Sequence, residues 1–162
     1  MGVQAARRHG EQMLRDSESR LRLALKAANQ GLWDLNVHTG AAQVSPEYAS
    51  MLGYDPETFE ETNSKWRDRL HPDEREHVCR LYEDYLGGLC EDYQAEFRQL
   101  TRQGDWRWIL SLGKVVERDD QGRPLRMLGT HTDISERKGR EIALRQSEDA
   151  LHRAQSLAKL GS

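Results

Sequence analysis

Cysteine is scarce in this 162-residue chain, and long apolar runs are absent. The two cysteines, Cys79 and Cys90, form neither a C-x-x-C pair nor a disulfide framework, which favours a reducing, cytoplasmic setting. No apolar run approaches the roughly 18 residues that a membrane-spanning helix needs. Arg7 and Arg8 are followed by no apolar stretch, so we predict no secretory signal and expect no membrane contact.

An excess of one charge sign is also missing. The formal net charge is -3, and acidic and basic residues are mixed along the chain, so no basic surface for nucleic acid is predicted. The sequence has no phosphate-binding Walker motif, no Gly-x-Ser-x-Gly turn, and no set of nucleophile, base and orienting group. The phospho-acceptor histidine motif of kinases and the catalytic loop of cyclases are absent as well. We therefore predict no catalytic residue in this chain.

Both ends of the chain lack aromatic residues and proline. All eleven aromatic residues lie between Trp33 and Trp108, and all four prolines lie between Pro46 and Pro124. This distribution predicts a folded core flanked by two helical arms. The expected parts are an N-terminal arm, the core and a C-terminal helix, at residues 1–29, 30–134 and 135–162.

Three segments of the core alternate apolar and polar residues in the way that half-buried strands do, and two segments next to turns are expected to be further strands. Turn residues at 103–105 and 119–124 join the last three segments, so the sheet is expected to be antiparallel. Helix signals, such as Pro72 followed by Asp73 and Glu74, separate the second strand from the third. Strands around a helical block predict the α+β class. The expected strands are residues 31–37, 41–45, 90–102, 106–117 and 125–132.

The two arms repeat one pattern. Eight positions of residues 14–31 recur at residues 144–161 with a constant offset of 130. A repeated unit that begins with a helix indicates tandem modules, and the last residues are expected to start a further copy. Heptad spacing along both arms favours a coiled coil between two subunits, although the stripes could instead pack on the chain's own sheet. The proposed dimer seam contains Leu14, Leu21, Leu144 and Leu151.

Six short motifs occur in one order over residues 18–138. They are Gly31–Leu35, Ser45–Tyr54, His71–Arg75, Gly104–Trp108, Asp120–Pro124 and Gly129–Lys138. With these motifs the chain resembles a PAS domain with a C-terminal PAC motif, a sensory module of bacterial signalling proteins. Ser135 stands where this family usually has threonine, and it keeps the hydroxyl group.

The resemblance implies a PAS fold, with a five-stranded antiparallel sheet and helices on one face. It also implies a pocket between sheet and helices, which in some members holds flavin, haem or a small metabolite. A histidine kinase or diguanylate cyclase domain usually follows such modules in the same chain. The candidate pocket-lining residues are Trp33, Leu35, Trp66, Phe97, Trp108 and Leu110.

The sequence contains no clear motif for binding a cofactor. The Asn-Cys-Arg motif of flavin photoreceptors is absent, and nothing distinguishes His77 as an axial ligand of haem. No cofactor is the simplest expectation, with non-covalent flavin or haem as alternatives. His71, Glu74 and His77 could face one way on a helix, but a helix start explains this segment, so we predict no metal site.

The junction between the last strand and the C-terminal helix is the candidate signal-coupling site. Asp133 can cap that helix, and Ile134 can anchor it in the core. Ser135, with its hydroxyl group, is the third residue of this candidate site. A change in the sheet could then alter the position of the helix. We therefore expect a homodimeric sensory and relay module. The alternatives are a structural dimerisation spacer and a cofactor-bearing redox or gas sensor.

Overall fold

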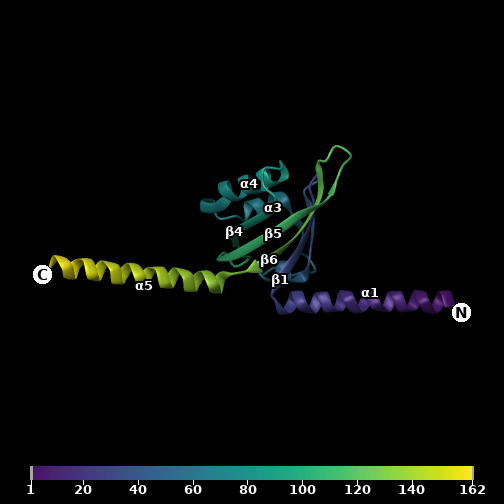
Figure 1. The fold of residues 1–162 in the computed structure, drawn as a ribbon, viewed down its shortest axis with the longest axis horizontal. Helices are drawn as coiled ribbons and strands as arrows, with labels where there is room; N and C mark the ends of the chain where they lie inside the picture. The colour runs from purple at the N-terminus through teal and green to yellow at the C-terminus, as the bar shows by residue number, and fades with distance from the viewer. Residues whose placement is uncertain (1, 162) are drawn as a thin grey trace.

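The computed structural model describes residues 2–161, and two helices extend from opposite sides of its core (Figure 1). The helices are α1 (Gly2–Ala27), α2 (Pro46–Ser50), α3 (Asn63–Asp68), α4 (Pro72–Leu86) and α5 (Ser135–Leu160). The strands are β1 (Gln30–Asn36), β2 (Ala41–Val44), β3 (Glu61–Thr62), β4 (Tyr93–Leu100), β5 (Trp106–Arg118) and β6 (Pro124–Asp133).

The strands form a single antiparallel sheet in the order β3-β2-β1-β6-β5-β4. The α+β class and the five predicted strands are confirmed, and the structure adds a sixth strand, β3. This strand has two residues, which is too short to produce an alternating pattern in the sequence. In the centre of the sheet, the first strand β1 pairs with the last strand β6, so both arms leave the core from adjacent strands.

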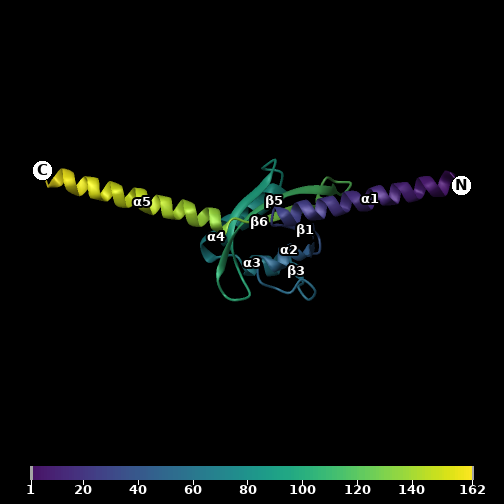
Figure 2. The ribbon, with the colours of Figure 1, turned by 90° about the horizontal axis from the view of Figure 1, so that it is seen from below.

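Helices α2, α3 and α4 cover one face of the sheet (Figure 2). Helix α4 begins at Pro72 and ends before Gly87, as predicted; the His71 side chain caps it by accepting a hydrogen bond from the Asp73 N–H. Buried aromatic side chains of these helices meet the inward residues of the strands and make up the hydrophobic core. Among residues 2–161, no helix buries side chains against the other face of the sheet.

The predicted orientation of β5 was wrong. Trp108 and Leu110 share a face, but it is the outer face of the sheet, and the inward residues are Ile109 and Ser111. A tryptophan and a leucine at alternate positions indicate a buried face, yet here the Trp108 ring is covered from outside. The guanidinium of Arg98 lies 5.0 Å from its centre and the Lys138 ammonium 4.9 Å, so two cations shield this ring from water.

Neither helix α1 nor helix α5 has a buried residue. The alternative in which the arm stripes pack on the chain's own sheet is therefore wrong for this structure. Helices α1 and α5 extend away from the core in both views (Figures 1 and 2). Within residues 2–161, no helix has the length and apolar character needed to cross a bilayer.

Candidate functional site

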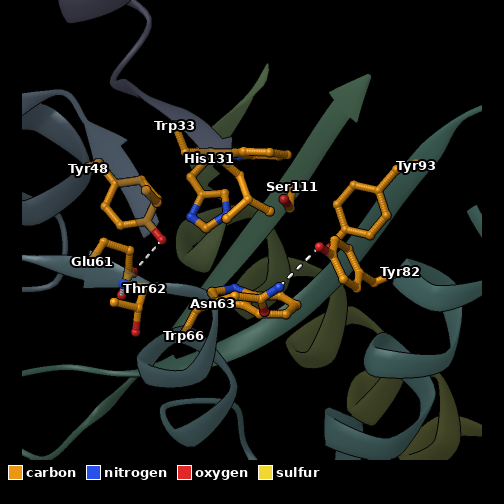
Figure 3. A pocket seen from close by; sticks show the side chains of 12 residues that line it. Trp33, Tyr48, Glu61, Thr62, Asn63, Trp66, Tyr82, Tyr93, Ser111 and His131 are labelled. Carbon is orange, nitrogen blue, oxygen red and sulfur yellow. Dashed lines mark hydrogen bonds between the residues drawn. The ribbon is translucent and has the colours of Figure 1, made fainter. Parts of the chain in front are cut away.

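A small cavity lies between the inner face of the sheet and helices α2, α3 and α4 (Figure 3). Its volume is about 50 Å³. In Figure 3, Trp33 and His131 lie above the cavity, Asn63 and Trp66 lie below it, and Tyr48 faces the Tyr82 and Tyr93 pair across it. The lining residues are Trp33, Leu35, Ala42, Tyr48, Glu61, Thr62, Asn63, Trp66, Tyr82, Tyr93, Ser111 and His131.

Two glycines on neighbouring strands allow Trp33 to lie against the sheet. A Cβ atom built on Gly113 would stand 2.5 Å from the Trp33 ring, and one built on Gly129 would collide with the same ring. Gly113 and Gly129 are paired across β5 and β6, so together they leave a flat recess of the right width. The roof of the cavity therefore depends on the absence of two side chains.

Aromatic rings surround the cavity and contact one another. Trp66 meets the Tyr82 ring at 6.3 Å, and Tyr82 meets Tyr93 edge-on at 6.2 Å. Tyr93 in turn meets Trp33 edge-on at 6.4 Å. Tilted and edge-to-face contacts of this kind hold the rings in defined orientations, so the wall of the cavity is preorganised.

A buried ion pair closes one side of the cavity. The Tyr48 hydroxyl donates to the Glu61 carboxylate at 2.6 Å, and the Arg69 guanidinium donates to the same carboxylate. Arg69 also donates through Nε to Gln99 at 3.2 Å, and the Gln99 amide donates to the Trp66 carbonyl. Burial and the Glu61 charge raise the pKa of Tyr48 well above its usual value, so Tyr48 remains a neutral donor.

His131 lies inside this aromatic wall. Its ring stacks on Tyr48 with centroids 4.7 Å apart and meets Phe97 edge-on at 5.7 Å. Burial, together with the Arg69 charge, lowers the pKa of His131 to about 3, so the imidazole is neutral at pH 7. The sequence analysis did not find this residue, because a single histidine in a strand has no accompanying motif.

Only some of the predicted pocket-lining residues line the cavity in the structure. Trp33, Leu35 and Trp66 line the cavity. Phe97 is fully buried and packs behind the lining, where its ring meets Trp66 edge-on at 5.6 Å. Trp108 and Leu110, on the outer face, do not belong to the cavity. Glu61, Asn63 and Ser111 were missed because polar residues at inward positions break the pattern by which core faces are recognised.

The root of helix α5 is bonded to β5. The Ile134 N–H donates to the Trp108 carbonyl at 2.8 Å, and the Trp108 N–H donates to the Ser135 hydroxyl at 2.9 Å. Asp133 was predicted as the N-cap, but the N-cap position belongs to Ile134. Asp133, the residue before this N-cap, accepts a hydrogen bond from the Ser135 N–H through its carboxylate. The guanidinium of Arg107 on β5 lies 3.7 Å from the same carboxylate.

Strand β4 holds the first turn of α5 from the side. The Glu96 carboxylate pairs with Arg137 and with Lys138, each at 2.6 Å. The hydrogen bond from Lys138, followed by that from Arg137, holds the pKa of Glu96 below its usual value. Because Glu96 alternates with the inward residues Ala95 and Phe97, the strand that carries the core ring also carries the helix contact.

Comparison with known proteins identifies the family. The sequence profile of the PAS fold matches residues 41–131, which is more than half of the chain. The chain belongs to the PAS family. Its core is therefore a sensory signalling module of the PAS type, as the motifs implied.

Two solved PAS structures resemble the chain well. A sensory box histidine kinase/response regulator from Burkholderia thailandensis is 37% identical, with a TM-score of 0.74, over 83% of this chain and 98% of that chain. The N-terminal domain of a diguanylate cyclase with PAS/PAC sensor from Marinobacter aquaeolei is 29% identical, with a TM-score of 0.59, over 67% and 98% of the two chains.

Curated relatives are longer proteins. A blue-light-activated histidine kinase from Brucella ovis is 27% identical over 77% of this chain, which spans 24% of that kinase. The chain spans a quarter or less of each of the first curated relatives that it matches. The matched region is therefore a small part of each of these relatives.

A flavin or haem does not fit the pocket of this PAS module. Pockets for molecules of drug size have volumes of roughly 300–1,000 Å³, several times the 50 Å³ found here. Cys79 is half-buried on α4 and does not line the cavity, and His77 on the same helix is exposed to solvent. Neither residue is placed to hold a group inside the pocket.

The carboxylates near His71 are also engaged. His71, Asp73 and Glu74 bring possible metal-ligand atoms within 4.8 Å of one another. The Nδ1 atom of His71 already accepts the Asp73 N–H at 3.0 Å, however, and Arg98 binds both Glu74 oxygens at 2.6 and 2.9 Å. This cluster stabilises the start of α4 and fixes it to β4.

Proposed function

We propose that this PAS module is a relay within a longer, cytoplasmic sensor protein. The pocket receives the signal, the sheet transmits it, and α5 carries it to the next module. Two copies associate through the arms, and a histidine kinase or diguanylate cyclase domain in the same chain produces the output. The observation that carries the proposal is the attachment of α5, which is bonded to β4 and β5 at its root and has no buried residue along its length.

The path from pocket to helix is short. Ser111 lines the cavity, and Trp108, whose backbone holds Ile134 and Ser135, lies three residues earlier on the same strand. On β6, His131 lines the cavity two residues before Asp133. A shift of either strand would therefore move the groups that fix the start of α5, and α5 could respond as a rigid rod.

The arms support association of two copies. The seam residues Leu14, Leu21, Leu144 and Leu151 are each about 60% exposed in the single chain. Such leucines at heptad spacing are stabilised when a second helix covers them. The 130-residue repeat extends the proposal, because it makes α5 both the output helix of this module and the entry helix of the next.

Substitution at the junction tests the relay. Asp133→Ala removes the acceptor of the Ser135 N–H and is expected to cost about 1 kcal/mol, as for a lost helix cap. We expect altered signal-dependent output of the full-length sensor, while the core keeps its melting temperature within a few degrees. Asp120→Ala, in the exposed turn before β6, is the matched control. Unchanged output of Asp133→Ala would refute the relay.

A second substitution separates the relay from a structural spacer. Ala42 of β2 lines the cavity. The larger side chain of Ala42→Leu would fill part of this cavity and would change neither the junction nor the arms. A relay predicts a changed output in the full-length sensor. A spacer, which only holds two chains together, predicts the output of the unmodified protein.

A further inference from the structure

Three buried polar atoms of pocket-lining residues have no hydrogen-bond partner. They are the indole Nε1 atoms of Trp33 and Trp66 and the side-chain carbonyl oxygen of Asn63. Trp33 is 9% and Trp66 8% exposed, so water from outside does not satisfy these donors. Leaving a buried polar group without a partner is destabilising, and three such groups around one cavity indicate that something else binds there.

The available groups have a definite chemistry. The two indole groups can only donate, and the Asn63 oxygen can only accept, because the Asn63 amide nitrogen already donates to the Tyr82 hydroxyl at 3.1 Å. A molecule that satisfies them must therefore carry both an acceptor and a donor. An aliphatic or purely aromatic ligand would leave all three unpaired.

The pocket offers no free charge. The Glu61 carboxylate is neutralised by Arg69 and also accepts from Tyr48. His131 is uncharged at pH 7 because burial lowers its pKa to about 3. A charged ligand would have to leave water without an opposite charge to meet it, which is costly in a buried site.

The size of the cavity limits the molecule further. One water needs roughly 10–15 Å³, and a cavity of about 150 Å³ holds benzene. The 50 Å³ found here lies between these values, so it suits a molecule of a few non-hydrogen atoms.

We propose that this pocket binds a small uncharged molecule with both a carbonyl-type acceptor and an N–H or O–H donor, of the class of simple amides. The proposal rests on the proposed sensory function and names the ligand class of the same site. The acceptor binds the indole N–H groups of Trp33 and Trp66, and the donor binds the Asn63 oxygen. Tyr48, Tyr82 and Tyr93 pack against the ligand's apolar surface.

Formamide and formate are a matched pair of probes, because they are nearly equal in size and differ in charge. The indole N–H signals of the 15N-labelled 162-residue chain report binding, and single Trp→Phe variants assign them. Trp106 and Trp108, on the outer face of the sheet, are internal controls. We expect formamide to shift the Trp33 and Trp66 signals with saturation and to leave the other two unchanged. Formate should cause no saturable shift.

Several results would overturn the proposal. Formamide shifts that do not saturate, or that are equal for all four tryptophans, would mean that the cavity holds water only. Saturable binding of formate would mean that the pocket accepts charge. Asn63→Leu, which removes the acceptor, should weaken formamide binding at least tenfold, with the Trp106 and Trp108 signals as a check of folding. Equal affinity of this variant would also contradict the assignment.

The same probe separates the ligand class from the relay. Saturable binding of formamide with no effect on the output of the full-length sensor would support the ligand class and contradict the relay. Absence of binding, with output that still responds to Asp133→Ala, would retain the relay and overturn the ligand class.

Discussion

The core and the arms of this PAS module differ in how far a single chain buries their apolar residues. Within residues 30–134, aromatic side chains from three helices and the sheet close around one cavity and around each other. The arms carry leucines at regular spacing, and in the single chain none of them is buried. The core thus buries its apolar residues within one chain, whereas the leucines of the arms are exposed in the single chain and are covered only in the proposed dimer.

This difference assigns separate tasks to the two regions. In the proposed relay the core receives the signal, and many ring contacts together with the Glu61–Arg69 pair hold its fold. The arms contribute little to that fold, so their arrangement can follow the core. At the root of α5, the connection between core and arm includes bonds at Trp108, Asp133, Ser135 and Glu96.

The largest expected effect separates the inner and outer faces of β5. Ile109 is fully buried, and Ile109→Ala should lower the free energy of unfolding by about 2–5 kcal/mol. Leu112 is 39% exposed on the outer face, so Leu112→Ala should cost clearly less than that. Urea denaturation of both variants measures the difference. Equal losses would show that the strand faces are not as the structure has them.

The next effect concerns the pH dependence of the core. The pKa of His131 is about 3 when folded and about 6.5 in an unfolded chain, so unfolding takes up a proton between these values. The contribution of His131 to stability is therefore fully present above pH 6.5 and decreases as the pH falls towards 3. The slope is about 1.4 kcal/mol per pH unit.

His131→Phe removes this proton uptake and keeps a ring that can stack on Tyr48. Relative to the unmodified chain, the variant should lose about 2 kcal/mol less stability between pH 7 and pH 5. Denaturation at a series of pH values checks this. Parallel curves for the two proteins would mean that His131 is not buried in its neutral form.

The smallest expected effect lies at the boundary between core and arm. Glu96→Gln removes the ion pairs with Arg137 and Lys138 and, because Glu96 is partly exposed, should cost only about 0.5 kcal/mol in global stability. Amide hydrogen exchange should nevertheless become faster in the first turn of α5 and remain unchanged in β4. Unchanged exchange in α5 would show that Glu96 does not hold the helix.

Much of the fold could be predicted from the sequence because its signals are local. Alternation and turn residues located the five longer strands, and Pro72 and Gly87 marked the ends of α4. The faces of β5 could not be predicted in this way, since the outward Trp108 is shielded by Arg98 of the neighbouring strand and by Lys138 of α5, contacts that only the folded chain makes. Periodicity identifies residues that share a face but not the side of the sheet that the helices cover.

The site was harder to predict than the fold. Trp33, Leu35 and Trp66 could be predicted from their hydrophobicity. Glu61, Asn63 and His131 are polar, and their role depends on contacts with residues that are distant in the sequence; the partners of Glu61 and Asn63, for example, lie 8 and 19 residues away. Gly113 and Gly129 matter only because Trp33 lies over them. Contacts of this kind are set by the tertiary structure, and no local pattern indicates them.

The mass of the 162-residue chain in solution tests the contrast between core and arms most directly. Light scattering over a range of concentrations should approach twice the 18.7 kDa of one chain. The double variant Leu21→Asp, Leu151→Asp should return the mass to that of one chain, with an unchanged melting temperature of the core. A single-chain mass of the unmodified protein at every concentration would contradict the account.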